Sequence, residues 1–401
     1  MHWISRAVAT AALLGLCAGA TNANPYKVLY RFGATPTDAG QPDGGLYLDG
    51  AGNLYGASAS GGDGYFRGAV YRIAPDGIES VLYSFKGVSA GDGQGPNSNL
   101  IADANGNLFG TTGNGGQGCS GAGCGTVFEV SPSGAETVLY KFGGGADGEN
   151  PIGLVMDASG NLYGATERGA GTGCDGSGCG TIFRLAPDGT ETVLYKFNGA
   201  NDGQYPVSRL LLDEQGNLYG ATAGQNQPGG TVFKLSPDGT LSTLHTFSGG
   251  ADGAAPASGL TFGKHGELYG TTILGGGSGC GGAGCGTIYK INRDGTGEEV
   301  VHAFNGADGS DPESEVVLDK RGNLYGTTYS SGEHNWGVIY ELTHDGSYNV
   351  LYNFCSRGEC RDGANGIGRG GLVLDSHNHL FGTTEQGGHR DFAGVAFTIR
   401  K

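Results

Sequence analysis

The chain has 401 residues, of which 84 are glycine and only 15% are charged. Glycine in this amount without a strict three-residue period excludes a collagen helix, and the many apolar runs between glycines exclude a disordered chain. Acidic residues outnumber basic ones by 39 to 23, which gives a formal net charge of -16. Because phosphate backbones are held by clusters of Lys and Arg, and the sequence shows none, we expect no nucleic-acid partner.

The first 23 residues have the form of a secretory signal peptide. Arg6 supplies a positive start, residues 7–20 are apolar, and the small residues Ala18, Ala20 and Ala23 offer a cleavage site. The apolar stretch is short for a membrane span, and no second one follows it. We therefore expect an exported protein, secreted or periplasmic, without a membrane span.

A short motif of the form Gly-Asn-Leu-Tyr-Gly recurs at regular intervals after the predicted signal peptide. Its leucines are Leu54, Leu108, Leu162, Leu218, Leu268, Leu324 and Leu380, at spacings of 54, 54, 56, 50, 56 and 56 residues. A fixed period of this size is typical of repeat architectures. The third repeat contains four short apolar runs, at residues 154–156, 161–166, 181–185 and 192–197. Runs of this length bounded by tight-turn residues predict four antiparallel strands, which together make a propeller blade.

The order of the strands predicts how the ring closes. A copy of the fourth strand, Val28–Phe32, precedes any first strand, and the sequence stops after a third strand at Val395–Ile399. Pairing these two segments would remove an exposed sheet edge. We predict an all-β, seven-bladed β-propeller over residues 24–401, with four strands per blade and the last blade closed by the N-terminal strand. The alternative is an open solenoid, which should carry polar terminal caps that the sequence lacks. We expect a monomer.

Eight of the nine cysteines form four pairs with four residues between partners. The pairs are Cys119 and Cys124, Cys174 and Cys179, Cys280 and Cys285, and Cys355 and Cys360. In an exported protein, such close pairs indicate local disulfides. Zinc sites, the rival interpretation, usually need four ligands and often closer spacing, so we predict no metal at these cysteines.

The long loops of each repeat should share one face of the ring, where the channel opens and where propeller sites tend to lie. Asp-Gly-x-x-Pro recurs there, and its aspartates include Asp147, Asp202, Asp252 and Asp308. A collar of carboxylates suits calcium or a polar ligand. The competing interpretation is an Asx-type turn in every blade, which the strict repetition favours. No other cofactor is expected.

Residues that break the repeat are the remaining candidates on the ligand face. His334 and Trp336 lie in the long loop of the sixth repeat and His389 in that of the seventh, and Glu167 and Glu385 are expected in similar loops. In such a group, a histidine beside a carboxylate can act as a general acid or base. No known catalytic motif occurs, however, so we assign no catalytic residue.

Two further histidines, His245 and His302, replace a tyrosine of the fourth strand. Their positions should face the neighbouring blade. We expect them to serve in packing between blades rather than in catalysis.

The repeated motifs together resemble the GloVer tandem repeat, a Gloeobacter/Verrucomicrobia-type repeat of exported choice-of-anchor proteins. The resemblance rests on Val-Leu-Tyr-x-Phe, Asp-Gly-x-x-Pro, Gly-Leu-x-x-Asp, Gly-Asn-Leu-Tyr-Gly-Thr-Thr and Gly-Thr-Val-Phe, and covers residues 25–401. It implies export and a propeller but no catalytic residues. Because the sequence ends inside the last blade, we expect no surface attachment by a C-terminal anchor.

These observations leave three functional hypotheses. The first is an exported binding scaffold that holds a glycan, peptide or protein at the long-loop face. The second is a polysaccharide-acting hydrolase or lyase with loop His, Asp or Glu residues at the channel mouth. The third is a purely structural extracellular protein.

Overall fold

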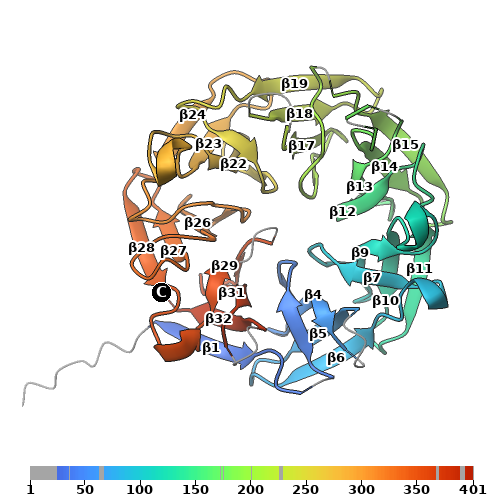
Figure 1. Ribbon diagram of the computed structural model, residues 1–401, viewed down its shortest axis with the longest axis horizontal. Helices are drawn as coiled ribbons and strands as arrows, with labels where there is room; N and C mark the ends of the chain where they lie inside the picture. Colours follow the sequence, from blue (N-terminus) through green and yellow to red (C-terminus); the bar gives the residue numbers. More distant parts are fainter. Residues whose placement is uncertain are drawn as a thin grey trace, which may run out of the picture.

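The strands form a closed ring of small sheets around a central channel (Figure 1). The computed structural model describes residues 25–400 except 36, 63–66, 172, 175, 200, 225–228, 367–369 and 389–392. Within those residues there are seven antiparallel sheets of four or five strands, one for each blade. The seven-bladed propeller predicted from the repeat is therefore confirmed. The predicted signal peptide and His389 lie outside the described residues.

Each blade runs from the channel to the rim in the order of its strands. The channel strands are β2 (Ala39–Pro42) with β3 (Tyr47–Leu48), β7 (Gly93–Pro96) with β8 (Ile101–Ala102), β12 (Glu149–Met156), β16 (Leu211–Leu212), β20 (Ala254–Pro256) with β21 (Thr261–Phe262), β25 (Val317–Leu318), and β29 (Ala364–Gly366) with β30 (Val373–Leu374). The second strands are β4 (Leu54–Gly61), β9 (Leu108–Gly115), β13 (Leu162–Arg168), β17 (Leu218–Thr222), β22 (Leu268–Leu274), β26 (Leu324–Thr327) and β31 (Leu380–Gln386).

The outer half of each blade is as regular as the inner half. The third strands are β5 (Ala69–Ile73), β10 (Thr126–Val130), β14 (Thr181–Leu185), β18 (Thr231–Leu235), β23 (Thr287–Ile291), β27 (Val338–Leu342) and β32 (Val395–Ile399). The rim strands are β1 (Tyr26–Arg31), β6 (Glu79–Ser84), β11 (Glu136–Lys141), β15 (Glu191–Lys196), β19 (Leu241–Thr246), β24 (Glu299–Ala303) and β28 (Tyr348–Asn353). Four 3-10 turns complete the described elements: η1 (Val88–Ala90), η2 (Cys119–Gly121), η3 (Cys280–Gly282) and η4 (Gly358–Cys360).

The two ends of the described chain meet in the seventh blade. Strand β1 pairs antiparallel with β32, with Tyr26 opposite Ile399 and Arg31 opposite Val395. Strand β1 thus takes the rim place that the other blades fill with their own fourth strand. The predicted closure is confirmed, and it leaves the third strand of this blade without an open edge.

A repeated glycine in the second strand makes room for a large aromatic side chain in the third. In the third blade, Gly164 lies opposite Phe183, and a Cβ on that glycine would approach the Phe183 ring to 2.5 Å. Phe142, which follows the rim strand of the preceding blade, meets the same ring edge-on at a centroid distance of 5.1 Å. Equivalent aromatic contacts join the other neighbouring blades. The core is accordingly a series of clusters, one between each pair of blades.

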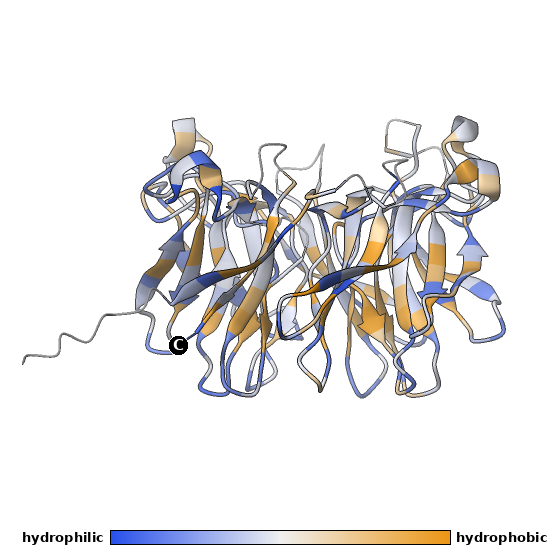
Figure 2. Ribbon diagram, turned by 90° about the horizontal axis from the view of Figure 1, so that it is seen from below, coloured by the Kyte–Doolittle hydropathy of each residue, from blue (hydrophilic) through white to orange (hydrophobic). Residues whose placement is uncertain are grey.

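The two faces of the ring differ in their connections. Hydrophilic tight turns line one face, and the longer loops with the 3-10 turns rise from the other (Figure 2). The prolines of Asp-Gly-x-x-Pro, expected in loops, lie in channel strands in several blades, as Pro151 does in β12. The channel strands therefore reach closer to the long-loop face than the apolar pattern indicated. Within the described residues, no helix has the length and apolar character needed to cross a bilayer.

Candidate ligand site at the central channel

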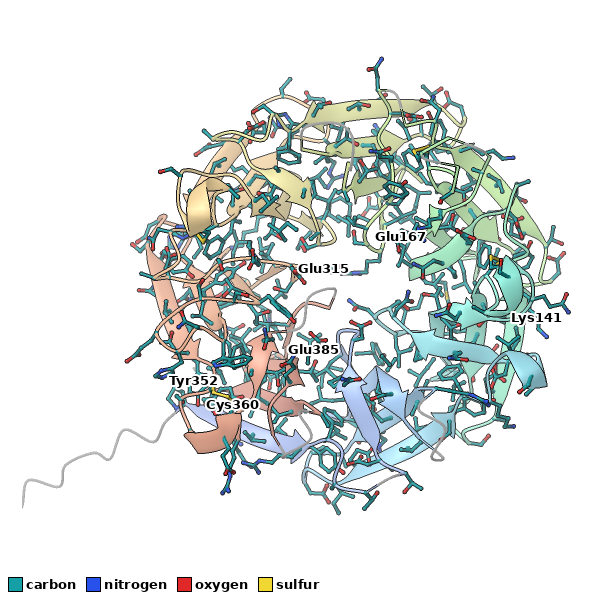
Figure 3. All side chains as sticks on the ribbon, in the orientation of Figure 1. Lys141, Glu167, Glu315, Tyr352, Cys360 and Glu385 are labelled. Carbon is teal, nitrogen blue, oxygen red and sulfur yellow. A yellow bond between two sulfur atoms is a disulfide. The ribbon has the colours of Figure 1, made fainter. Side chains whose placement is uncertain are left out.

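One position in or just before the channel strand of each blade breaks the symmetry of the ring. It is the glycine of Gly-Leu-x-x-Asp, which four blades keep as Gly45, Gly153, Gly259 and Gly371. The other three blades, which alternate with glycine blades, carry Asn99, Arg209 and Glu315 at this position. Figure 3 shows Glu315 at the centre of the ring, beside the channel axis. In the sequence, these residues are three departures from the Gly-Leu-x-x-Asp motif, and they were not among the predicted site residues.

Arg209 and Glu315 form a bidentate ion pair that crosses part of the channel. Arg209 Nε lies 3.0 Å from Glu315 Oε1 and 2.8 Å from Oε2, and a terminal guanidinium nitrogen lies 2.8 Å from Oε2. Because the partners come from the fourth and sixth blades, the pair passes over the fifth. A Cβ on Gly259 of that blade would lie 2.0 Å from Glu315 Oε1. The glycine of the intervening blade is thus a steric requirement of the ion pair.

The ion pair is unevenly buried. The Glu315 side chain is 5% exposed and the Arg209 side chain 32%. Burial raises the pKa of Glu315 above its usual range, while the neighbouring Arg209 guanidinium opposes that rise. A carboxylate this deeply buried needs its partner, since an unpaired buried charge is costly.

Asn99, Arg209 and Glu315 each line two neighbouring pockets of the channel. Channel strands run from the long-loop face toward the tight turns. On the turn side, the pocket has a volume of about 380 Å³ and mostly apolar walls, with Ile101 and Val317 among them. We name these three residues the septum. The septum lies between this pocket and the long-loop end of the channel, which we call the mouth.

The mouth is bordered by polar side chains of the first and second strands. Asn97 Nδ2 donates to Asn150 Oδ1 at 3.1 Å, and Asn150 in turn donates to the Glu167 carboxylate. Glu385 lies on another side of the channel (Figure 3). Burial raises its pKa, a hydrogen bond with Tyr329 lowers it, and nearby Asp43 raises it. We name this group, with Asn97, Asn150, Glu167, Tyr329 and Glu385, the mouth cluster.

Glu167 and Glu385 were expected in loops, but the structure places them in strands β13 and β31. Both follow the Thr of the Gly-Thr-Thr or Gly-Ala-Thr segment of the second strand. Five other blades carry Ala59, Gly113, Ala223, Ile273 and Tyr329 at the equivalent position. The strand setting fixes the direction of both carboxylates better than a loop would.

The repeated aspartates accept hydrogen bonds from groups in or just after the rim strand that precedes them in the sequence. Asp147 accepts hydrogen bonds from Tyr140 Oη at 3.1 Å and from the Gly143 backbone amide at 2.9 Å. Asp202 repeats this arrangement with Tyr195 and Asn198. The partners belong to rim strands or follow them, so these carboxylates do not join the mouth cluster.

His245 and His302 take the place of that tyrosine in two blades. Their Nε2 atoms lie 3.4 Å from Asp252 Oδ2 and 3.1 Å from Asp308 Oδ2, respectively. His302 also stacks on Tyr348 of the next blade, with ring centroids 4.0 Å apart. Both histidines therefore contribute to the packing of the ring.

The remaining candidates of the sixth-blade loop also lie apart from the mouth cluster. Trp336 is partly buried against the hydrophobic cluster between the sixth and seventh blades. His334 is partly buried in the same loop. Neither has a described contact with the septum.

Carboxyl groups also meet between neighbouring blades at the rim. Burial raises the pKa of Glu79, Glu136 and Glu191 to about 7, and an aspartate of the preceding blade contributes by repulsion. For Glu136 that aspartate is Asp92. The Oε1 atom of each of these three glutamates is buried and has no hydrogen-bond partner among the described residues. These positions favour the protonated acid.

The cysteine pairs form disulfides, as predicted. The bonds join Cys119 to Cys124, Cys174 to Cys179, Cys280 to Cys285 and Cys355 to Cys360. Glu149 lies close to Cys119 and Cys124, but the two cysteine sulfurs are bonded to each other and offer no thiolate to a metal. Four disulfides indicate an oxidising compartment, extracellular or periplasmic.

The repeat itself matches a known family. The Gloeobacter/Verrucomicrobia repeat matches residues 16–173, 118–283 and 280–401, which overlap and cover most of the chain. The chain belongs to this family. The predicted resemblance is thereby confirmed. No curated protein matches the sequence of this Gloeobacter/Verrucomicrobia repeat protein.

Solved structures show the same fold at low identity. An inactive virginiamycin B lyase from Staphylococcus aureus, crystallised with quinupristin, is 17% identical with a TM-score of 0.60, over 94% of this chain and 100% of the lyase. The extracellular domain of a one-component system from B. thetaiotaomicron is 9% identical with a TM-score of 0.57, over 92% of this chain and 39% of the other. For this Gloeobacter/Verrucomicrobia repeat protein, such likeness establishes the propeller fold alone.

Proposed function

We propose that this protein is an exported binding scaffold whose ligand occupies the channel mouth on the long-loop face. The observation that carries the proposal is the septum. Asn99, Arg209 and Glu315 break an otherwise regular ring at one level, beneath the mouth cluster. Polar side chains that break the repeat at the channel of a rigid ring favour a ligand site there.

The side chains of the mouth favour a neutral, hydroxyl-rich ligand such as the end of a glycan. Amides of Asn97 and Asn150 offer both donors and acceptors, and Glu167 and Glu385 add acceptors. Sugar hydroxyls can pair with both kinds of group. An anionic ligand is disfavoured here, because the mouth has two carboxylates and the chain has a net charge of -16.

Export is the second part of the proposal. The four disulfides and the predicted leader over residues 1–23 support it together. An extracellular or periplasmic position would bring the mouth into contact with glycans outside the cytoplasm.

A glycan array probed with the disulfide-bonded mature chain tests the proposal. We expect a neutral glycan to bind, and Glu167→Gln with Glu385→Gln to weaken its affinity about tenfold, or ~1.4 kcal/mol. Glu359→Gln is the matched control, because Glu359 is exposed on the same face and pairs with Arg361 away from the mouth. Absence of any glycan binder, or equal binding by the double variant, would contradict the proposal.

The same mixtures separate binding from catalysis. If the wild-type chain cleaves a bound glycan and Glu385→Gln abolishes cleavage, the hydrolase or lyase hypothesis replaces the scaffold. Product analysis by mass spectrometry detects that outcome.

A further inference from the structure

A second recess lies on the opposite, tight-turn face, between the fifth and sixth blades. Its volume is about 610 Å³. Basic side chains dominate its charged lining: Lys264, Lys290, Arg321, His265 and His344, against the single carboxylate Glu267. We name it the basic groove. In a chain with a net charge of -16, this concentration of basic groups is a local departure from the overall charge.

The groove also departs from the repeat. The turn between first and second strands has Lys264 and His265 in the fifth blade, and Lys320 and Arg321 in the sixth. None of the five corresponding turns, at residues 49–53, 103–107, 157–161, 213–217 and 375–379, contains a Lys or Arg. The basic residues are therefore absent from the turn motif itself and gather in one sector of the ring.

Two of the cations have no ion-pair partner among the described residues. Lys290 Nζ is paired with Glu299 at 2.9 Å. Glu267 is engaged locally, where it accepts from the His265 backbone amide at 2.9 Å and lies 3.3 Å from Tyr269 Oη. Lys264 extends over Gly322 of the next blade, where an added Cβ would lie 3.5 Å from its Nζ. Lys264 and Arg321 thus stand on the two sides of the groove with their charges available.

We propose that the basic groove binds a carboxylated glycan, a short segment of a uronate-containing polysaccharide. Arg321 offers the planar fork that matches a carboxylate, and Lys264 offers a point charge on the facing blade. The volume lies within the usual range of small-ligand sites, ~300–1,000 Å³. It exceeds the need of a single inorganic anion, and Tyr269 and Leu318 in the lining supply apolar surface for a sugar ring.

This site is independent of the channel mouth, since it lies on the other face and takes a ligand of opposite charge preference. The negative charge of the whole chain repels polyanions at long range. Binding must then depend on the groove cations themselves, which makes their removal a sharp test.

The test is isothermal titration calorimetry of the mature chain with trigalacturonate, with maltotriose as the neutral probe. We expect trigalacturonate to bind, maltotriose not to compete for the site, and Lys264→Gln with Arg321→Gln to weaken affinity at least about tenfold. Lys141→Gln with Lys196→Gln is the matched control, because it removes the same charge from exposed rim strands and should bind as the wild type does. Arg321→Lys should recover only part of the affinity, since it keeps the charge without the fork.

Three results would overturn the proposal. They are no binding of trigalacturonate by the wild type, equal binding by the groove variant, or displacement by inorganic phosphate at concentrations equal to the glycan. Circular dichroism of each variant confirms folding, which we expect because Lys264 and Arg321 are exposed.

Discussion

Removing Arg209 alone from the septum ion pair should destabilise the ring at least as much as removing both partners. Arg209→Ala leaves the Glu315 carboxylate, 5% exposed, without its partner. Breaking a buried pair in this way costs about 3–5 kcal/mol. Glu315→Ala leaves Arg209, which is 32% exposed and can turn toward water, so we expect a smaller loss of about 1–2 kcal/mol.

The double variant Arg209→Ala with Glu315→Ala should lose no more than Arg209→Ala alone, because no buried charge remains. The difference between the double loss and the sum of the single losses should then be at least ~1 kcal/mol. Urea unfolding of the four proteins measures it. Additive losses, with a coupling under ~0.5 kcal/mol, would refute the account of the septum.

The same variants have a pH signature. Protonation neutralises an unpaired Glu315, so the loss caused by Arg209→Ala should shrink as the pH falls. A loss that stays constant between about pH 8 and about pH 5 would mean that Glu315 is hydrated rather than buried.

Three further predictions concern the ring itself. Glu79, Glu136 and Glu191 have folded-state pKa values of about 7, so the stability that their protonation contributes is complete below the unfolded pKa and lost as the pH rises through about 7. Urea unfolding should therefore give greater stability at about pH 5 than at about pH 8. Changing all three residues to Gln should reduce that difference, and an unchanged difference would contradict the assignment. Phe142→Ala should cost about 3–5 kcal/mol by removing the contact with Phe183, while Lys141→Ala on the exposed side serves as the control; similar unfolding midpoints for the two variants would refute the role of the aromatic contact between blades. Removing one disulfide, by Cys119→Ser with Cys124→Ser, should lower stability by about 2 kcal/mol, as expected for a six-residue loop, with the far-ultraviolet spectrum retained. Global unfolding of this variant would show that the loops, rather than the blades, hold the ring.

The architecture could be read from the sequence because the repeat carries its own strand order. The extra fourth-strand copy at Val28–Phe32 identified the partner of Val395–Ile399. The repeated glycine before each Thr or Ala, such as Gly164, signalled a close approach, and the structure identifies Phe183 as the side chain that it admits. These features are local and periodic, so one repeat explains all seven.

The septum was harder to find because it depends on side chains from different blades. Arg209 and Glu315 are 106 residues apart and meet only after the ring closes. Lys264 and Arg321 likewise form no charge run in the sequence, and the ring brings their turns together. The spacing of the aspartates, in turn, gave their level in the ring but not the direction of their carboxylates, which depends on the backbone amides and rim tyrosines beside them.

Cross-linking of a bound glycan tests the proposed site most directly. A neutral glycan selected on the array, fitted with a photoreactive group, should attach to peptides that contain β13 (Leu162–Arg168) or β31 (Leu380–Gln386). Peptide mapping by mass spectrometry identifies the sites of attachment. Cross-links confined to rim strands or to the tight-turn face would contradict a ligand at the channel mouth.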